Sequence, residues 1–348
     1  MRFQVSLLPH AIAFAVALSR VVDGRLASTA AAPADTSRAV AQLRADADSL
    51  RPLTRSRLAR EFLAATAVLS ARAPRTVWRD SARTRWWNDV EARALPDSTR
   101  ARLVSRELDE SFFWNTRYGS PLSYVRALEI AARHGFEDLR GRRVADFGCG
   151  MIGQLQLMAS RGAEVIGIDV DAMLRVLYSE SRDLGEIRGD DGRRGRTRLA
   201  IGRWPAEPAV VTEVGGGFDL FLSKNTLKNG YLHPAEKVDL RMLVDLGVSD
   251  SAFVAALARV VKPGGLVVIY NLSPAPAPPD KPYLPWADGR CPFPRERWEA
   301  SGFEVLTYDE DDGPAARAMG HALGWDRGDG GMKLESDLFA HVSVFRRR

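Results

Sequence analysis

The chain has 348 residues, of which 45% are hydrophobic and 27% charged, and it carries a net charge of +5. This composition is typical of a soluble globular protein with one large domain or two smaller ones. Arginine supplies most of the positive charge, and acidic residues are interspersed with it. Because no basic stripe is present, we expect no nucleic-acid partner. The two cysteines, Cys149 and Cys291, are too few for a disulfide framework or a cysteine-rich zinc site, and we expect free thiols.

The first 36 residues contain a short apolar stretch, Ala11–Leu18, which follows Arg2 and precedes small residues at 27–32. This order resembles a secretory signal, although Pro9 and several charged residues interrupt it. A start codon assigned too far upstream would give the same pattern, so both interpretations stay open. The stretch is too short to span a bilayer, and we expect no stable membrane insertion.

Residues 37–110 are predicted to form a helical N-terminal extension. Apolar residues recur at helical spacing from Val40 to Val68, and tryptophans mark a second helical stretch that reaches about residue 108. A segment of this kind is more often a packing cap than a catalytic element. A further helix is predicted from Pro121 to His134, because Gly135 then ends it.

From Arg142 onward, short apolar runs alternate with segments of helical pattern. The predicted strands cover 144–147, 165–168, 199–201, 218–222 and 266–270, and the predicted helices cover 153–161, 171–182 and 249–261. Continuous apolar runs favour parallel strands with helices on both faces. Two final strands, 303–308 and 338–345, lack an ordinary helical crossover and are predicted to be an antiparallel addition. We therefore expect residues 111–348 to form an α/β domain around a mostly parallel, Rossmann-like sheet of seven strands, with 186–198 as a solvated loop.

A glycine turn follows the first predicted strand, in the sequence VADFGCGMIG (144–153). Glycines allow a tight turn, so that a nucleotide can pack against the main chain. Asp169 ends the next strand and is placed to accept hydrogen bonds from ribose hydroxyls. Asp146 precedes the first glycine by two residues, where its carboxylate could hold an ammonium group. A nicotinamide cofactor offers no cation there.

Together with VVKPGG (260–265) and GFEV (302–305), this turn makes residues 110–348 resemble the class I S-adenosylmethionine-dependent methyltransferases. The resemblance implies S-adenosyl-L-methionine as the cofactor and methyl transfer as the reaction. It also implies that Asp146, Gly148 and Gly150 lie along the methionine part of the cofactor, Asp169 on its ribose and Val170 against adenine. No N-P-P-Y-like motif occurs, so the acceptor is expected to be a small molecule rather than a nucleic-acid base.

The sequence departs from the family pattern in two places. Two residues separate Gly150 from the third glycine, Gly153, where the family often has one. After the third strand, IGRWP (201–205) replaces the acidic residue that commonly contacts adenine in the family. Trp204 therefore either packs on adenine or fills the core.

Candidate catalytic residues follow the fourth strand, in FDLFLSKNTLKNGYLHP (218–234). Methyl transfer depends mainly on positioning and on excluding water, and it needs a base only if the acceptor loses a proton. Lys224, Tyr231 and His233 are the candidates, and Asn225 is assigned to the cofactor site. His233 has the pKa best suited to a base. Alternatively, it caps a helix that begins at Pro234.

The segment WNTRYGSP (114–121) adds Arg117 and Tyr118 to the expected cofactor site. Arg117 either makes a two-pronged contact with the methionine carboxylate or forms an ion pair with Asp109 or Glu110.

A proline-rich loop, 272–294, leaves the carboxyl end of a predicted strand, where open α/β sheets bind their ligands. We expect this loop and the N-terminal extension to form the acceptor pocket with Trp114, Tyr283 and Trp286. The acidic run DEDD (309–312) is predicted to be a solvated turn rather than a metal site.

Two other classes of function stay open. A nicotinamide-dependent oxidoreductase fits the glycine spacing, and a non-catalytic cofactor-binding module would keep the turn without an acceptor pocket. The sequence indicates no oligomeric state. Because S-adenosylmethionine is a cytoplasmic cofactor, we expect the protein to be cytoplasmic.

Overall fold

The computed structural model describes residues 37–348. The interpretations of residues 1–36 as a signal or an upstream extension lie outside this range. Within it, no helix is both long enough and apolar enough to cross a membrane.

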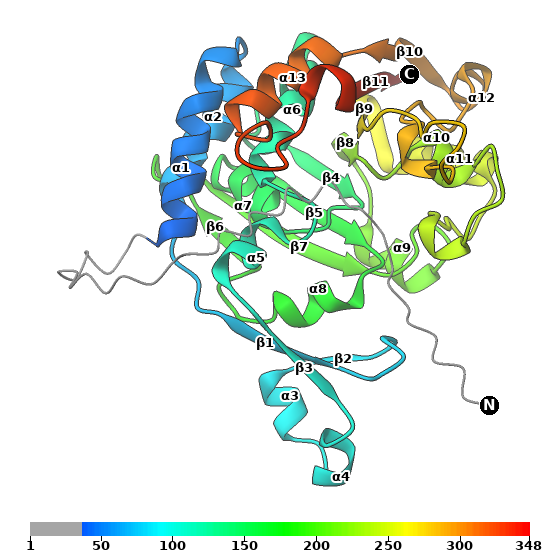
Figure 1. Cartoon of the computed structure of the whole chain (residues 1–348). Coiled ribbons are helices and arrows are strands. Elements are labelled where there is room, and N and C mark those ends of the chain that lie inside the picture. Colours follow the sequence, from blue (N-terminus) through cyan, green and yellow to red (C-terminus); the bar gives the residue numbers. More distant parts are fainter. Residues whose placement is uncertain (1–36) are drawn as a thin grey trace.

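A central sheet of eight strands organises the molecule, in the order β10-β11-β9-β8-β4-β5-β7-β6. Its strands are β4 (Arg143–Phe147), β5 (Glu164–Asp169), β6 (Gly185–Arg188), β7 (Arg194–Ile201), β8 (Phe218–Lys224), β9 (Val261–Ser273), β10 (Phe303–Asp311) and β11 (Phe339–Arg347). The strands from β9 to β7 are parallel, whereas β11 runs antiparallel to both β9 and β10. The predicted fold class, a mostly parallel Rossmann-like sheet with an antiparallel C-terminal strand, is confirmed (Figure 1).

Helices cover both faces of this sheet, and each face has its own core. One core includes side chains from α1 (Arg38–Leu50), α2 (Arg57–Ala64), α6 (Val125–Arg133), α7 (Gly153–Ser160), α8 (Ala172–Leu177) and α13 (Gly313–Ala322). The other includes side chains from α9 (Pro208–Val214), α11 (Asp250–Val260) and α12 (Arg295–Ala300). Successive residues of a strand point to opposite faces, and accordingly Val144 belongs to the first core and Ala145 to the second.

The predicted loop at 186–198 is instead the hairpin of β6 and β7, which adds the eighth strand. Arg194, Arg196 and Arg198 obscured the strand pattern in the sequence. Their side chains alternate with less exposed positions, and Thr197 and Ala200 are buried. A strand with one solvated face accepts such a charged row, whereas a strand covered on both faces does not.

The expectation that the two last strands lack a helical crossover is also wrong. Helix α13 lies between β10 and β11, followed by the short α14 (Leu334–Asp337). Ala316 and Met319 of α13 are buried. The glycines and alanines of this segment leave little helical pattern of large apolar residues in the sequence. In the structure the helix packs on β11 beside α6 (Figure 1).

The N-terminal extension is helical only in its first part. After α1 and α2 it forms a three-stranded antiparallel sheet in the order β2-β1-β3. This sheet consists of β1 (Arg75–Arg79), β2 (Trp86–Asn88) and β3 (Val104–Leu108), and the short helices α3 (Asp89–Arg93) and α4 (Asp97–Arg100) accompany it. The tryptophans read as helical thus lie on strands, which aromatic side chains favour. The small sheet packs against α8 (Figure 1).

A buried ion pair attaches this small sheet to the main one. The Arg75 guanidinium donates to the Asp183 carboxylate, with 2.9 Å between Nη2 and Oδ1, and to the Leu177 carbonyl. Asp183 is fully buried and Arg75 is 8% exposed. Arg75 also pairs with Glu180 at 3.1 Å, whereas the buried Asp183 carboxylate depends on Arg75 for compensation of its charge.

Candidate functional site

The glycine turn lies at the carboxyl end of β4, where the sheet order changes direction between β5 and β8. Open α/β sheets bind ligands at such a switch point. Gly148 and Gly150 have left-handed φ angles of +72° and +63°. A Cβ at Gly148 would overlap the Thr226 side chain, and one at Gly150 would overlap the Tyr118 ring. Both positions therefore require glycine.

Asp169, at the end of β5, holds the turn in place. Its Oδ2 accepts a hydrogen bond from the Gly150 N–H at 2.8 Å, and its Oδ1 accepts one from the Asp171 N–H at 2.9 Å. Burial raises the pKa of Asp169, while these N–H groups act in the opposite direction. A carboxylate offers about four acceptor positions, so further donors can still be accepted. The neighbouring Val170 is 65% exposed.

Asp146 lies under the turn and is fully buried. It accepts hydrogen bonds from the Tyr124 hydroxyl at 3.2 Å and from the Gln154 amide at 2.8 Å. Burial raises its pKa to about 7, although both hydrogen bonds and the nearby Lys224 ammonium favour the ionised form. The carboxylate predicted to face the ligand thus has two protein donors already.

Lys224 and Lys228 are buried beside one another after β8, and they are 8% and 3% exposed. Burial lowers the pKa of Lys224 to about 8, against the attraction of Asp146. Burial and repulsion by Lys224 lower the pKa of Lys228 to about 7. The Lys224 ammonium lies 5.3 Å from the centre of the Tyr124 ring. A group with a pKa near 8 can exchange a proton near neutral pH.

Tyr231 and His233 belong to the short helix α10 (Asn229–Leu232) and the position after it. Burial, with Tyr118 nearby, raises the pKa of Tyr231 to about 12, so its hydroxyl keeps its proton. His233 Nε2 lies 3.1 Å from Asp250 Oδ2, and its side chain is 43% exposed. No helix begins at Pro234, so the predicted helix cap is wrong.

Asn225 has a left-handed φ of +63°, and its Oδ1 accepts a hydrogen bond from the Leu272 N–H at 2.7 Å. Its side chain therefore ties the segment after β8 to the end of β9. The structure assigns this amide a local partner, and its contact with a cofactor stays a prediction.

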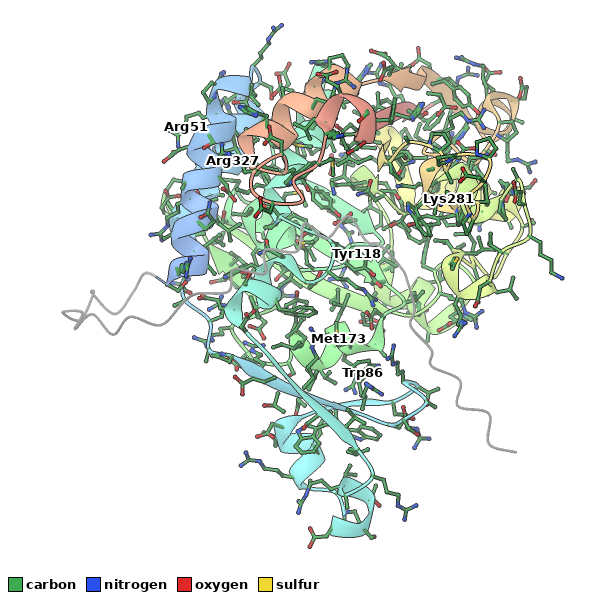
Figure 2. The ribbon with its side chains drawn as sticks, in the orientation of Figure 1. Arg51, Trp86, Tyr118, Met173, Lys281 and Arg327 are labelled. Carbon is green, nitrogen blue, oxygen red and sulfur yellow. The ribbon has the colours of Figure 1, made fainter. Side chains whose placement is uncertain are left out.

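The ring of Tyr118, which is labelled in Figure 2, lies against Gly150 of the glycine turn. Arg117 pairs with Asp171 at 2.8 Å, and not with Asp109 or Glu110. Those two acids have other roles: Asp109 caps helix α5 (Glu110–Asn115), and Glu110 accepts from a backbone N–H. The Arg117 guanidinium also lies 5.1 Å from the centre of the Tyr118 ring. Tyr118 itself is 43% exposed over Gly150.

Two tryptophans considered for ligand contact lie in the cores. Trp204 is 1% exposed, with its ring 5.4 Å from that of Phe253 and 5.5 Å from that of Phe221. Of its two predicted roles, the geometry supports the core one. Trp114 is fully buried against Phe113. It therefore cannot line an acceptor pocket as predicted.

Three residues that the sequence analysis did not single out contact the turn directly. Tyr124 and Gln154 bind Asp146, and Thr226 packs on Gly148. Gln154 had one possible signal, since an amide in the first turn of an otherwise apolar helix needs a buried partner. The other two are brought to the turn from helix and loop segments distant in sequence.

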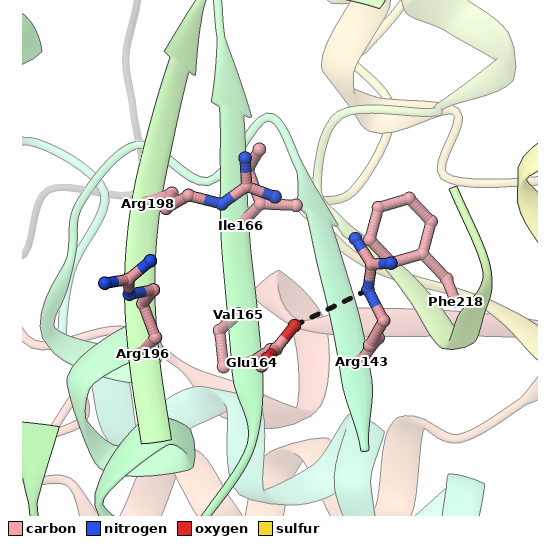
Figure 3. Close-up of a pocket in the computed structure, with 7 residues that line it drawn as sticks. All are labelled: Arg143, Glu164, Val165, Ile166, Arg196, Arg198 and Phe218. Atoms are coloured by element: carbon pink, nitrogen blue, oxygen red, sulfur yellow. Dashed lines mark ion pairs between the residues drawn. The ribbon is translucent and has the colours of Figure 1, made fainter. Parts of the chain in front are cut away.

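Two cavities differ sharply in size and position. The larger, about 540 Å³, is formed mainly by residues 274–286 of the proline-rich loop, including Tyr283 and Trp286, and none of its lining comes from the N-terminal extension. The smaller, about 10 Å³, lies at the amino ends of the strands beside the Arg143–Glu164 pair (Figure 3). It has room for about one water molecule and lies at the opposite edge from the glycine turn.

The acidic run 309–312 is not the solvated turn that was predicted. Asp309, Glu310 and Asp311 belong to β10, and Asp312 forms a buried ion pair with Arg126. Across residues 37–348, no three His, Cys, Asp or Glu side chains are grouped as metal ligands. Both cysteines are free and buried, as expected.

No family model and no curated protein sequence matches the chain. Its fold is similar to that of the [4+2]-cyclase SpnF, at 18% identity and a TM-score of 0.38, over 64% of this chain and 80% of that one. It is also similar to a TehB-like SAM-dependent methyltransferase from Corynebacterium glutamicum, at 17% identity and a TM-score of 0.31, over 65% and 88% of the two chains. A geranyl diphosphate C-methyltransferase from Streptomyces coelicolor is similar at 14% identity and a TM-score of 0.37, over 65% and 80%. At these identities and TM-scores, the likenesses carry no argument about activity.

Proposed function

We propose that this protein transfers a methyl group from S-adenosyl-L-methionine to a small-molecule acceptor. The observation that carries the proposal is the glycine turn at the switch point of a sheet in which β11 runs antiparallel between β9 and β10. The dinucleotide-binding order 3-2-1-4-5-6 contains no such reversed strand. The class I methyltransferases, which the sequence resembles, have such a reversed strand.

In this proposal the cofactor lies across the turn. Asp169 would accept the ribose hydroxyls on its remaining acceptor positions, and the exposed Val170 would pack on adenine. The main chain of Gly148 and Gly150 would contact the methionine part. Tyr118 covers Gly150, so its ring would have to lie over the cofactor or move aside.

Arg117, Asn225 and Asp146 have protein partners in this structure, so we assign them supporting roles. Arg117 already donates to Asp171 through Nη2, so a contact with the methionine carboxylate would use its remaining N–H groups. Asn225 holds the end of β9, and Asp146 acts through Tyr124 and Gln154. Each helps to shape the turn on which the cofactor would bind.

Among the candidate bases, Lys224 is the best placed. It ends β8 beside the turn, and its pKa of about 8 makes the neutral amine accessible near neutral pH. Tyr231, with a pKa of about 12, would donate a hydrogen bond rather than accept a proton. His233 is oriented by Asp250 at a half-exposed position and is the second candidate base.

Calorimetry with S-adenosylmethionine, S-adenosylhomocysteine, NADH and NADPH tests the cofactor assignment. We expect the first two to bind and the nicotinamide cofactors not to bind. Asp169→Ala should weaken the binding of S-adenosylhomocysteine about 10- to 100-fold, because hydrogen bonds to a charged group are lost. Asp48→Ala, at a 73% exposed position on α1, is the control and should bind normally. Binding of NADH or NADPH without S-adenosylmethionine would contradict the proposal.

Gly148→Ala should weaken the binding of S-adenosylhomocysteine at least about 10-fold, because the cofactor would pack against the main chain of this turn. Its Cβ would overlap Thr226, which must shift the turn. Adding Thr226→Gly should restore most of the affinity. Gly192→Ala is the matched control, because Gly192 has φ +79° with open space around it. Equal affinity in wild type and Gly148→Ala would show that the turn does not bind the cofactor.

A further inference from the structure

The cavity in the proline-rich loop, hereafter the proline pocket, is apolar and of ligand size. Its volume is about 540 Å³, and its walls include Met242, Pro274, Tyr283 and Trp286. Small-molecule sites typically occupy about 300–1,000 Å³ with mostly hydrophobic and aromatic walls. The position after the carboxyl end of β9 also matches where sheets of this kind bind ligands.

The charged residues that line the proline pocket do not provide a buried charge for a ligand. Lys281 is 65% exposed and lies 3.7 Å from Asp280. Asp337 accepts hydrogen bonds from the Lys333 N–H and from the Ser336 hydroxyl. The pocket therefore offers an ionised ligand only an exposed cation and a carboxylate that already accepts hydrogen bonds, and no buried charge of opposite sign.

The walls of the pocket are held by contacts outside it. Lys228 Nζ donates to the carbonyls of Trp286, at 3.2 Å, and of Leu272. The Ala235 N–H donates to the Tyr283 hydroxyl at 3.2 Å. Prolines restrict the backbone between these points. A cavity with such walls is formed before the ligand arrives, which lowers the entropy cost of binding.

The same short segment that holds the pocket also contacts the glycine turn. The Thr226 hydroxyl donates to the Gly148 carbonyl at 3.4 Å, and Lys228 follows two residues later. The contacts from Gly148 through Thr226 and Lys228 to Trp286 are therefore continuous. One segment, Thr226–Lys228, therefore contacts both the glycine turn and the wall of the pocket.

We propose that the proline pocket binds the uncharged, apolar body of the methyl acceptor, and that Lys228 is a positioning residue for its wall. This inference rests on the proposed methyl transfer and adds the chemical class of the acceptor. It predicts that the pocket prefers a neutral apolar molecule to a charged molecule of the same shape.

Two fluorescent probes that share one skeleton test this class. N-phenyl-1-naphthylamine is neutral, and 8-anilinonaphthalene-1-sulfonate carries the same rings with a sulfonate. We expect the neutral probe to bind saturably at one site. Its affinity should be at least about 10-fold higher than that of the sulfonate, because burying an unpaired charge is unfavourable. Tighter binding of the sulfonate would overturn the assignment.

Pocket-filling variants locate the probe. Ala275→Trp and Ala277→Trp place an indole on the wall and should each weaken the neutral probe at least about 10-fold by taking up its space. Val90→Ala, at a 79% exposed apolar position on α3, is the control and should bind the probe normally. Circular dichroism checks folding, and the two filling variants are independent of each other. Undiminished probe binding in a folded filling variant would overturn the inference.

Lys228→Met tests the positioning role separately. It should lower the affinity for the neutral probe while leaving the ratio of the two probe affinities as in the wild type. Lys228→Arg should recover part of the lost affinity. Calorimetry with S-adenosylhomocysteine is run on the same samples. If the wild type binds the probe but not S-adenosylhomocysteine, the proposed methyl transfer is overturned and the pocket assignment is not. Absence of saturable probe binding, with the cofactor bound, would overturn the pocket assignment alone.

Discussion

Arg75→Met is expected to lower the free energy of unfolding by about 3–5 kcal/mol, as when one partner of a buried ion pair is removed. The substitution leaves the fully buried Asp183 carboxylate without its guanidinium and the Leu177 carbonyl without that donor. Methionine keeps much of the side-chain volume, so the loss measures charge and hydrogen bonding rather than a cavity. Urea unfolding of the wild type and the variant gives the difference.

The control for this result is Arg51→Met. Arg51 is 57% exposed and pairs with Asp48 at the surface, where an ion pair contributes about 0–1 kcal/mol. A second variant, Arg75→Met with Asp183→Leu, removes both charges and should recover part of the loss, as apolar replacements of buried pairs often do. If Arg75→Met and Arg51→Met unfold alike, the pair does not stabilise the attachment of the small sheet.

From pH 5 to pH 8, the wild type is expected to lose about 2–3 kcal/mol of unfolding free energy that Asp146→Asn does not lose. Burial raises the pKa of Asp146 from its ordinary 3.8 to about 7 in the folded protein. Between about pH 4 and pH 7 the folded state thus binds more protons than the unfolded one. The contribution of Asp146 is present below pH 4 and is lost as the pH rises through 7, and asparagine has no such dependence.

Urea unfolding of both proteins at pH 5 and pH 8 measures this difference. Asp219→Asn is the control of opposite sign, because hydrogen bonds and ion pairs with Lys262 and Arg142 outweigh burial and lower the pKa of Asp219. It titrates below pH 4, so it should leave the change between pH 5 and pH 8 as in the wild type. Parallel stability curves for wild type and Asp146→Asn would contradict the raised pKa.

The parallel sheet could be predicted because each of its inner strands is a short and almost wholly apolar run. Residues Phe218–Leu222 needed no knowledge of their neighbours to indicate a strand covered on both faces. The glycine turn was equally local, since the spacing of its glycines indicates a tight turn after a strand, and the structure gives Gly148 and Gly150 the left-handed φ angles that glycine favours. By contrast, β6, the first part of β7 (194–198) and helix α13 were missed, and only 199–201 of β7 was predicted as a strand. Arginines and small residues weaken the hydrophobic period there, and pairing with β5 or packing on β11 stabilises the element instead.

Within the candidate site, the sequence by itself determined which residues form the turn, because Asp146, Gly148 and Gly150 are neighbours along the chain and Asp169 ends the next strand. Only the tertiary structure decided their partners. Arg117 pairs with Asp171, which lies 54 residues away, and Trp204 is enclosed by rings from other elements. The physical reason is that backbone angles and hydrophobic period are properties of a short segment, whereas burial, ion pairing and pKa depend on segments that meet only when the chain is packed.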